Sequence, residues 1–170
     1  MAPSLRIDDA SPDEARALLQ ACCGSTRWVA RMLALRPFKT AASLAAAARR
    51  EWFGLTPEDW REAFAHHPRI GDRESFRVTF PATHQLSERE QAGMGGASEE
   101  TISALAAANA AYERTFGYIF IVCATGKSAD DMLDLLTARL QNDPITELGV
   151  AAQEQAQITG LRLKPLGVTQ

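Results

Sequence analysis

All three histidines of the chain fall within 19 residues, as His66, His67 and His84. Histidine has the unperturbed pKa nearest neutrality, so a histidine anchored beside a loop is a candidate acid or base. Pro68 directs His67 out of helical geometry and fixes the direction in which the chain leaves. Because adjacent residues project differently, we expect at most one of the pair in a pocket. A purely structural role, in which a histidine complements a helix dipole, stays open.

A second candidate is the sequence SEREQ at residues 87–91. Ser87 and Glu90 have the spacing of a capping box, in which each side chain binds a backbone N–H of the other residue. A helix start also offers free amides to an anionic or carbonyl ligand, with Glu90 and Gln91 available for specific contacts. The spacing favours the cap, and both roles are compatible.

The sequence YIFIVCA at residues 118–124 has the composition of a buried strand. In an otherwise helical chain this strand has no evident pairing partner, so its backbone donors and acceptors must be satisfied in another way. A urea-like or amide-like ligand is one candidate. Burial against side chains or water is the other, and the pattern does not decide between them.

Metal chemistry has weak support, although His67, Asp72, His84 and Glu90 are ligand types in one region. The chain has no HExxH sequence, no paired histidines at helical spacing and no cysteine cluster. It also lacks a GxSxG elbow, a phosphate-binding GxxxxGK loop and a dinucleotide fingerprint. By elimination we expect no metal and no cofactor.

The elements that would position these residues are helical. Ser11, Thr40 and Thr56 are predicted N-caps, and Gly24, Gly54 and Gly117 are predicted helix ends, with Gly24 left-handed. The expected fold is an all-α, single-domain bundle of seven or eight helices. Helices are expected at 12–23, 27–36, 41–53, 57–67, from 87, and at 98–116, 128–141 and 144–161. An ordered active-site loop is expected after the fourth of these helices, over 68–86, where FRVTF is a possible short strand.

Length and composition predict one globular domain over residues 1–170. The chain is 46% hydrophobic and 23% charged, with a formal net charge of −3. Without a basic stripe, nucleic acid is not an expected partner. The longest apolar run, 118–125, is too short for a bilayer, so no membrane association is expected. Three cysteines without metal spacing and no visible secretory signal indicate a reducing cytoplasm.

Four separated stretches resemble one known family when taken in order. They are HPRIGD at 67–72, SEREQAG at 87–93, NAAYERTFGYIFIVCATGKS at 109–128 and RLQNDPITELGVAAQEQAQITGLRL at 139–163. Together with the capped N-terminal helices they resemble the 2-oxo-4-hydroxy-4-carboxy-5-ureidoimidazoline (OHCU) decarboxylases. The resemblance implies an all-α, cofactor-free and commonly homodimeric enzyme of uric acid degradation. Such an enzyme converts its small-molecule substrate to (S)-allantoin and carbon dioxide.

The resemblance also implies a set of site residues. His67 would be the catalytic acid/base, and Glu90 the important carboxylate. The substrate would be lined by Pro68, Ser87, Glu88, Arg89, Glu90, Gln91, Phe120, Ile121, Val122, Cys123, Ala124 and Arg162. The ending GVTQ is not a peroxisomal signal, so the chain looks like a bacterial cytoplasmic member. A helical interaction module without catalysis and a metal-dependent hydrolase are the alternatives.

Overall fold

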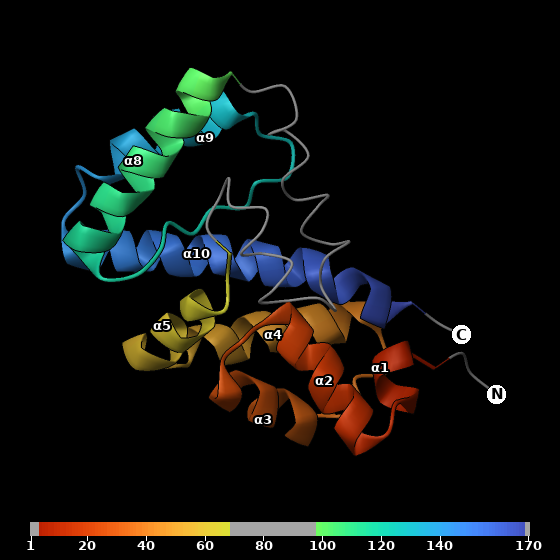
Figure 1. Cartoon of the computed structure of the whole chain (residues 1–170). Helices are drawn as coiled ribbons and strands as arrows, with labels where there is room; N and C mark the ends of the chain where they lie inside the picture. Colours follow the sequence, from red (N-terminus) through yellow and green to blue (C-terminus); the bar gives the residue numbers. More distant parts are fainter. Residues whose placement is uncertain (1–3, 69–97, 169–170) are drawn as a thin grey trace. The chain divides into compact units, whose positions relative to one another are not determined.

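The computed structural model describes residues 4–68 and 98–168, and within them the regular secondary structure is helical (Figure 1). Eight α-helices occur in this part of the chain, so the all-α prediction is confirmed. The expected loop beyond Pro68 and the helix expected from Ser87 lie outside the described residues. The elements are α1 (Arg6–Asp9), α2 (Pro12–Cys22), α3 (Thr26–Ala34), α4 (Ala41–Phe53), α5 (Pro57–Ala65), α8 (Glu99–Phe116), α9 (Ala129–Arg139), α10 (Pro144–Leu163) and a 3-10 helix at Lys164–Gly167.

Most of these helices begin at a side-chain cap, and the predicted caps at Ser11, Thr40 and Thr56 are confirmed. The hydroxyl oxygen of the N-cap accepts a hydrogen bond from the backbone N–H three residues later, which satisfies a donor that the helix itself leaves free. At Ser128 the cap is reciprocal, because Asp131 accepts from the Ser128 N–H at 2.9 Å. The capping residues of this kind are Ser11, Ser25, Thr40, Thr56, Ser98 and Ser128.

The predicted helix ends agree with the structure at two glycines and disagree at a third. Gly117 ends α8 with φ +82° and donates its N–H to Glu113 O at 2.8 Å, and Gly54 caps α4. Gly24 is not left-handed, so that expectation is wrong. Cys23 ends α2 in an extended conformation, which leads the chain directly towards the next N-cap at Ser25.

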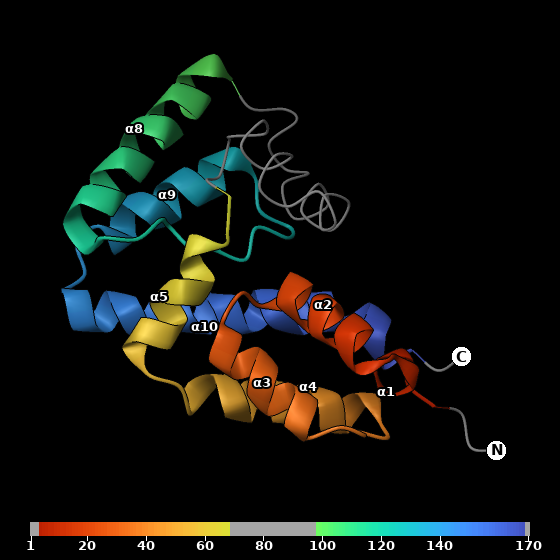
Figure 2. The same cartoon turned by 60° about the horizontal axis from the view of Figure 1, so that its bottom comes forward.

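The chain divides into two compact units, which are residues 1–63 with 156–170, and residues 64–155. In the first unit α2 packs on α3 and α3 on α4 (Figure 2). The fully buried indole of Trp28 donates from Nε1 to Ala48 O at 3.0 Å, which joins α3 to α4. The indole of Trp60 likewise donates to Trp52 O at 2.9 Å, which joins α5 to α4. Both aromatic side chains therefore combine apolar burial with a satisfied polar atom.

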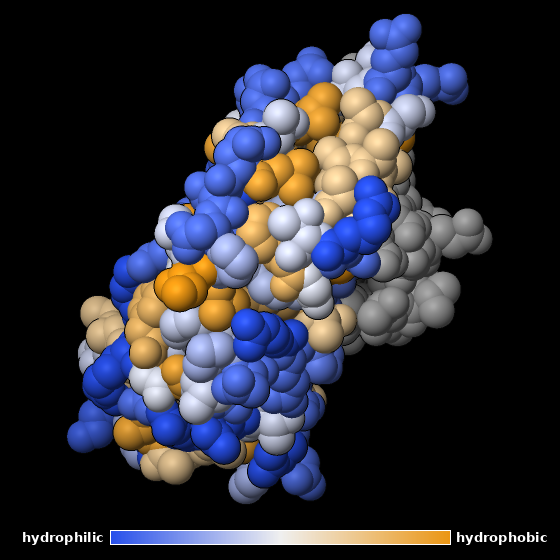
Figure 3. All heavy atoms as spheres, turned by 90° about the vertical axis from the view of Figure 1, so that its left-hand side faces the viewer, coloured by the Kyte–Doolittle hydropathy of each residue, from blue (hydrophilic) through white to orange (hydrophobic). Residues whose placement is uncertain are grey.

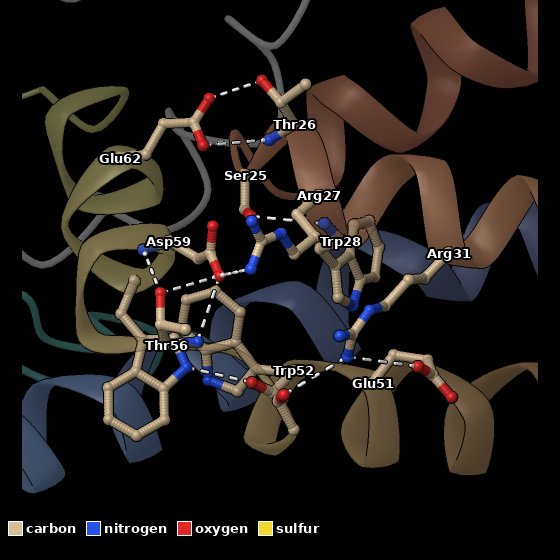
Figure 4. A network of polar contacts seen from close by, with 12 residues as sticks. Ser25, Thr26, Arg27, Trp28, Arg31, Glu51, Trp52, Thr56, Asp59 and Glu62 are labelled. Carbon is tan, nitrogen blue, oxygen red and sulfur yellow. Dashed lines mark hydrogen bonds and ion pairs between the residues drawn. The ribbon is translucent and has the colours of Figure 1, made fainter.

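A polar network attaches the start of α5 to α3 in this unit (Figure 4). Glu62 accepts from Thr26 N at 3.2 Å and from Thr26 Oγ1 at 2.5 Å. Arg27 pairs with Asp59 at 3.3 Å. Burial acts to raise the pKa of Asp59, but hydrogen bonds from Thr56 and the nearby arginine charges outweigh it, so the pKa is lowered from 3.8. The network orients the helix that ends just before His66.

The core of the second unit is formed by α8, α9 and the segment between them. Leu105, Tyr112, Phe120, Met132 and Leu136 are its central residues, each at most 2% exposed. At residue 109 the buried position on α8 is occupied by an asparagine, which is 4% exposed.

The surface of the same unit carries several large apolar side chains. Ile102 at 39%, Leu135 at 38% and Ile145 at 86% are exposed. Hydrophobic residues set among hydrophilic ones are visible in the side view of Figure 3. Ile102 lies in the first turn of α8.

A buried ionic cluster links α8, α9 and α10 in this unit. Glu147, fully buried, accepts from Arg139 Nε at 2.7 Å and from Asn142 Nδ2 at 2.9 Å, and the Tyr112 hydroxyl donates to the same carboxylate. Arg139 is 7% exposed. Burial, together with the hydrogen bond to Glu147, raises the pKa of Tyr112 well above its usual range, so its hydroxyl stays protonated.

Removing one member of this cluster should be strongly destabilising. Arg139→Met leaves the Glu147 carboxylate buried without its cation, and we expect the free energy of unfolding to fall by about 3–5 kcal/mol. Arg61→Met is the matched control, because Arg61 pairs with Glu58 at 3.9 Å on the surface. We expect that change to cost less than about 1 kcal/mol. Urea denaturation followed by far-ultraviolet circular dichroism measures both, and equal effects would contradict the structural role of the cluster.

The lowered pKa of Asp59 predicts a loss of stability in acid. A carboxylate whose folded pKa lies below its unfolded value stabilises the fold above the unfolded pKa, and that contribution is lost as the pH falls through the folded pKa. The free energy of unfolding should therefore decline below about pH 4 in the native chain, and less steeply in Asp59→Asn. Urea titrations between pH 2 and 7 measure the two slopes. An acid slope in Asp59→Asn equal to that of the native chain would contradict the role assigned to this carboxylate.

Candidate active site

The two adjacent histidines at the end of α5 have different surroundings. The N–H of His67 donates to Phe64 O at 3.1 Å, which continues the helical turn beyond Ala65. His66 is exposed and His67 is half-buried. Nε2 of His67 lies 2.5 Å from Oε1 of Gln155, a fully buried residue of α10. The expectation that the two side chains project differently is therefore confirmed, and His67 is the one held against the interior of its unit.

The segment Phe120–Ala124 is buried, with each residue at most 5% exposed, but it forms no strand. The expected strand at YIFIVCA is therefore wrong as secondary structure, whereas the expected burial is confirmed for residues 120–124. Side chains satisfy several of its backbone groups. Arg139 Nη1 donates to Ile121 O at 2.6 Å, Cys123 N donates to a Glu154 oxygen at 2.6 Å, and Lys127 Nζ donates to Cys123 O at 2.8 Å. For these groups, side chains take the place that a neighbouring strand would have had.

The three side chains that hold this segment were not predicted from the sequence. Arg139 lies over the Phe120 ring, with Cζ 4.5 Å from its centroid, so one guanidinium contacts an aromatic face, a backbone carbonyl and the Glu147 carboxylate. A charged residue within a buried stretch of an amphipathic helix is the signal that could have indicated Arg139. Glu154 and Lys127 carry no such signal, because their partners depend on the path of the segment.

Two of the expected parts of the site meet on α10. Gln155 contacts the His67 ring and Glu154 accepts from the Cys123 N–H, and the two residues are consecutive. The structure therefore anchors His67 and the segment Phe120–Ala124 to one turn of one helix. A helix is a rigid mount, so this arrangement fixes the imidazole relative to the segment. Residues 154 and 155 were missed as site residues by the sequence reasoning.

Arg162 and the cysteine pair lie in the other unit. Arg162 is 8% exposed, and its carbonyl accepts from Cys22 Sγ at 3.5 Å. Burial raises the pKa of Cys22 and of Cys23 to about 12, although the Arg162 charge acts in the opposite direction. Both thiols therefore stay protonated near neutrality and are poor nucleophiles. The expected contact of Arg162 with substrate stays a prediction.

Several predicted residues lie outside the described part of the chain. They are Asp72, His84, Ser87, Glu88, Arg89, Glu90 and Gln91. Among the described residues, no group of three or more histidine, cysteine or acidic side chains is placed to hold a metal ion. The helices of residues 4–68 and 98–168 include none with the length and apolarity needed to cross a membrane.

The family model described as OHCU decarboxylase matches residues 8–164. A crystal structure of OHCU decarboxylase in the presence of (S)-allantoin is 34% identical, with a TM-score of 0.74, and the match covers 91% of this chain and 96% of that chain. A crystal structure of (S)-allantoin synthase, 19% identical with a TM-score of 0.66 over 92% of this chain and 51% of that chain, shares the fold.

Relatives also occur among curated proteins. The Arabidopsis thaliana uric acid degradation bifunctional protein TTL is 36% identical over 146 residues, which are 85% of this chain and 45% of that protein. The 2-oxo-4-hydroxy-4-carboxy-5-ureidoimidazoline decarboxylase of Amia calva is 29% identical over 132 residues, which are 77% of this chain and 74% of that protein. The chain thus spans less than half the length of the Arabidopsis relative. The family match extends over almost all of the described residues and includes both His67 and α10, and the chain belongs to the OHCU decarboxylase family.

Proposed function

We propose that this chain is a cofactor-independent carboxy-lyase that converts 2-oxo-4-hydroxy-4-carboxy-5-ureidoimidazoline to (S)-allantoin in uric acid degradation. The observation that supports this most directly is the half-buried His67, held by Gln155 beside the anchored segment Phe120–Ala124. Membership of the family and the likeness to a decarboxylase solved in the presence of (S)-allantoin support the choice of substrate.

The reaction requires proton movements and a place for one electron pair. Loss of carbon dioxide breaks the bond between ring carbon 4 and the carboxylate, and the electron pair is delocalised into the imine at carbon 5. Carbon 4 becomes a carbonyl as its hydroxyl proton leaves. Carbon 5 must then receive a proton on one face, which makes the product a single enantiomer. The former imine nitrogen takes up a second proton from solvent, because loss of carbon dioxide from a carboxylate consumes one proton overall. No redox change occurs, and the substrate itself supplies the electron sink.

His67 is the proposed acid/base in this sequence. Its imidazole takes the hydroxyl proton and returns a proton to the ring, and positioned acid–base groups of this kind typically contribute about 10²–10⁴ in rate. Pro68 contributes by fixing the exit of the chain from α5. Because Gln155 is buried on α10, the ring is oriented before substrate arrives.

Substrate binding is assigned to three groups of residues. Main-chain groups of Phe120–Ala124 that Arg139, Glu154 and Lys127 do not occupy would bind the ureido and ring carbonyls. Arg162 would pair with the departing carboxylate, although binding it too tightly would stabilise the ground state. Ser87, Glu88, Arg89, Glu90 and Gln91, which lie outside the described residues, would complete the lining, with Glu90 orienting His67 or holding the ureido nitrogens.

The remaining expectations about the whole protein are proposals as well. A single domain over residues 1–170 is supported by one family model that covers residues 8–164. A homodimer is supported by the resemblance and by the exposed side chains of Ile102, Leu135 and Ile145. A reducing cytoplasm is supported by the three cysteines, which are all buried and form no disulfide. No metal and no cofactor are assigned to the reaction.

His67→Ala should abolish catalysis and leave the fold intact. We expect kcat to fall by about 10²–10⁴, because the group that exchanges protons is gone. The assay supplies freshly generated products of urate oxidation and follows the optical activity of allantoin, since the uncatalysed reaction gives both enantiomers. His66→Ala is the matched control at the exposed neighbour and should keep native turnover. Native rates in a folded His67→Ala protein would refute the assignment.

Glu90→Gln separates a catalytic carboxylate from a helix cap. Glutamine retains a capping oxygen, so the melting temperature should stay near the native value while turnover falls by at least about tenfold. The same optical assay and a thermal melt give the two readouts. Unchanged turnover with a lower melting temperature would assign Glu90 to the cap alone.

A further inference from the structure

The contact between His67 and Gln155 determines where the imidazole carries its proton. Gln155 presents Oε1 to the ring at 2.5 Å from Nε2. A carboxamide oxygen accepts hydrogen bonds and cannot donate, so the proton between the two atoms belongs to Nε2. In a neutral imidazole only one nitrogen carries a hydrogen, and Nδ1 is then the nitrogen with the lone pair.

We infer that Gln155 is a positioning residue, which holds neutral His67 in the Nε2–H tautomer so that Nδ1 exchanges the proton with the substrate. The inference rests on the proposed decarboxylase function and assigns a specific atom to it. Nδ1 accepts the hydroxyl proton as the carboxylate leaves, which gives an imidazolium with both nitrogens protonated. Nδ1 then returns a proton towards carbon 5, and the neutral Nε2–H form is restored.

The chemistry of Gln155 suits both halves of this cycle. Its oxygen accepts from Nε2–H whether the ring is neutral or charged, so the ring does not have to turn between the two proton transfers. Its position is fixed by complete burial on α10. The neighbouring carboxylate on α10, Glu154, binds Cys123 N–H, and the nearest carboxylate along α5, Glu62, binds Thr26.

A neutral acceptor differs from the carboxylate that often orients a catalytic histidine. A carboxylate beside the ring favours the imidazolium, which makes a proton easier to take and harder to return. An amide fixes the tautomer without a full negative charge. With Gln155 on Nε2 and the substrate on Nδ1, Glu90 is then the group that holds the ureido nitrogens, and it does not orient the ring. Acid and base roles in one cycle need both transfers to be accessible near neutral pH, and the amide is suited to that requirement.

Nitrogen-15 NMR of the full chain with labelled histidine reads the tautomer without any substrate. The three histidines are assigned with His66→Gln and His84→Gln. We expect His67 to show a protonated Nε2 with a solvent-protected Nε2–H signal and an unprotonated Nδ1. In Gln155→Met, the protected Nε2–H signal should disappear. The shifts of both His67 ring nitrogens should move towards the averaged values of an imidazole that exchanges between its two neutral tautomers. An Nδ1–H tautomer in the native chain, or a native spectrum in Gln155→Met, would overturn the inference.

Kinetics of the same variants separate positioning from folding. In Gln155→Met we expect kcat to fall about 10- to 100-fold with KM nearly unchanged, because the substrate contacts remain while part of the acid–base contribution is lost. Gln155→Glu keeps an acceptor and adds a charge. It should retain the Nε2–H signal and move the acid limb of the kcat/KM profile upward by about 1–3 pH units. Gln157→Met, at an exposed position on the same helix, is the control and should behave as the native chain.

The two readouts distinguish failure of this inference from failure of the proposed function. If the native chain forms (S)-allantoin but His67 is in the Nδ1–H tautomer, the role of Gln155 is refuted and the proposed decarboxylase function stands. If His67 is in the Nε2–H tautomer but the chain forms no (S)-allantoin, the proposed decarboxylase function is refuted, together with the proton transfer assigned to Nδ1. If Gln155→Met does not fold, an unshifted pH profile in Gln155→Glu overturns the inference by itself.

Discussion

The organisation of the second unit depends on one constraint: the segment Phe120–Ala124 is buried without a neighbouring strand. A buried backbone N–H or C=O that lacks a hydrogen bond costs free energy comparable to a lost hydrogen bond. Arg139, Glu154 and Lys127 supply such bonds from three directions. Bringing the Arg139 guanidinium into the interior in turn requires the Glu147 carboxylate, and Tyr112 and Asn142 bind that carboxylate.

Helix α10 contributes both to the buried ionic cluster and to the candidate site. Its first turn supplies Glu147 to the buried cluster, and two turns later Glu154 and Gln155 hold the segment and the imidazole. The same helix thus stabilises the unit and sets the geometry of the candidate site. A change that shifts the register of α10 would move the imidazole partner and the segment together, because residues 154 and 155 are adjacent.

The proposed cofactor-free decarboxylation would place particular demands on such a site. Since the substrate of that reaction provides its own electron sink, the protein would have to orient the substrate and move protons. Both tasks depend on rigid placement more than on reactive groups. An imidazole held by a buried amide, beside a segment held by buried side chains, meets that demand, and it agrees with membership of the OHCU decarboxylase family.

The helices can be predicted from the sequence alone, and so can the choice of His67 over His66. Caps at Ser11, Thr40 and Thr56 and the helix end at Gly117 are local signals that act over three or four residues, so they were predictable. Four ordered stretches indicated the family. The exceptions were also local in origin: the short α1 has too few residues for a periodic pattern, and the left-handed end expected at Gly24 was replaced by an extended one.

The hydrogen bonds of the buried segment and the group that holds the imidazole become visible only in the folded chain. Residues 118–124 have a strand composition. These seven residues alone do not show that Arg139, Glu154 and Lys127 bind the backbone groups that a neighbouring strand would have bound. Gln155 lies 88 residues from His67, and a glutamine on a helix has no local signature of its partner. Local hydrogen bonds and periodicity can be read along the chain, whereas contacts over such separations arise from packing.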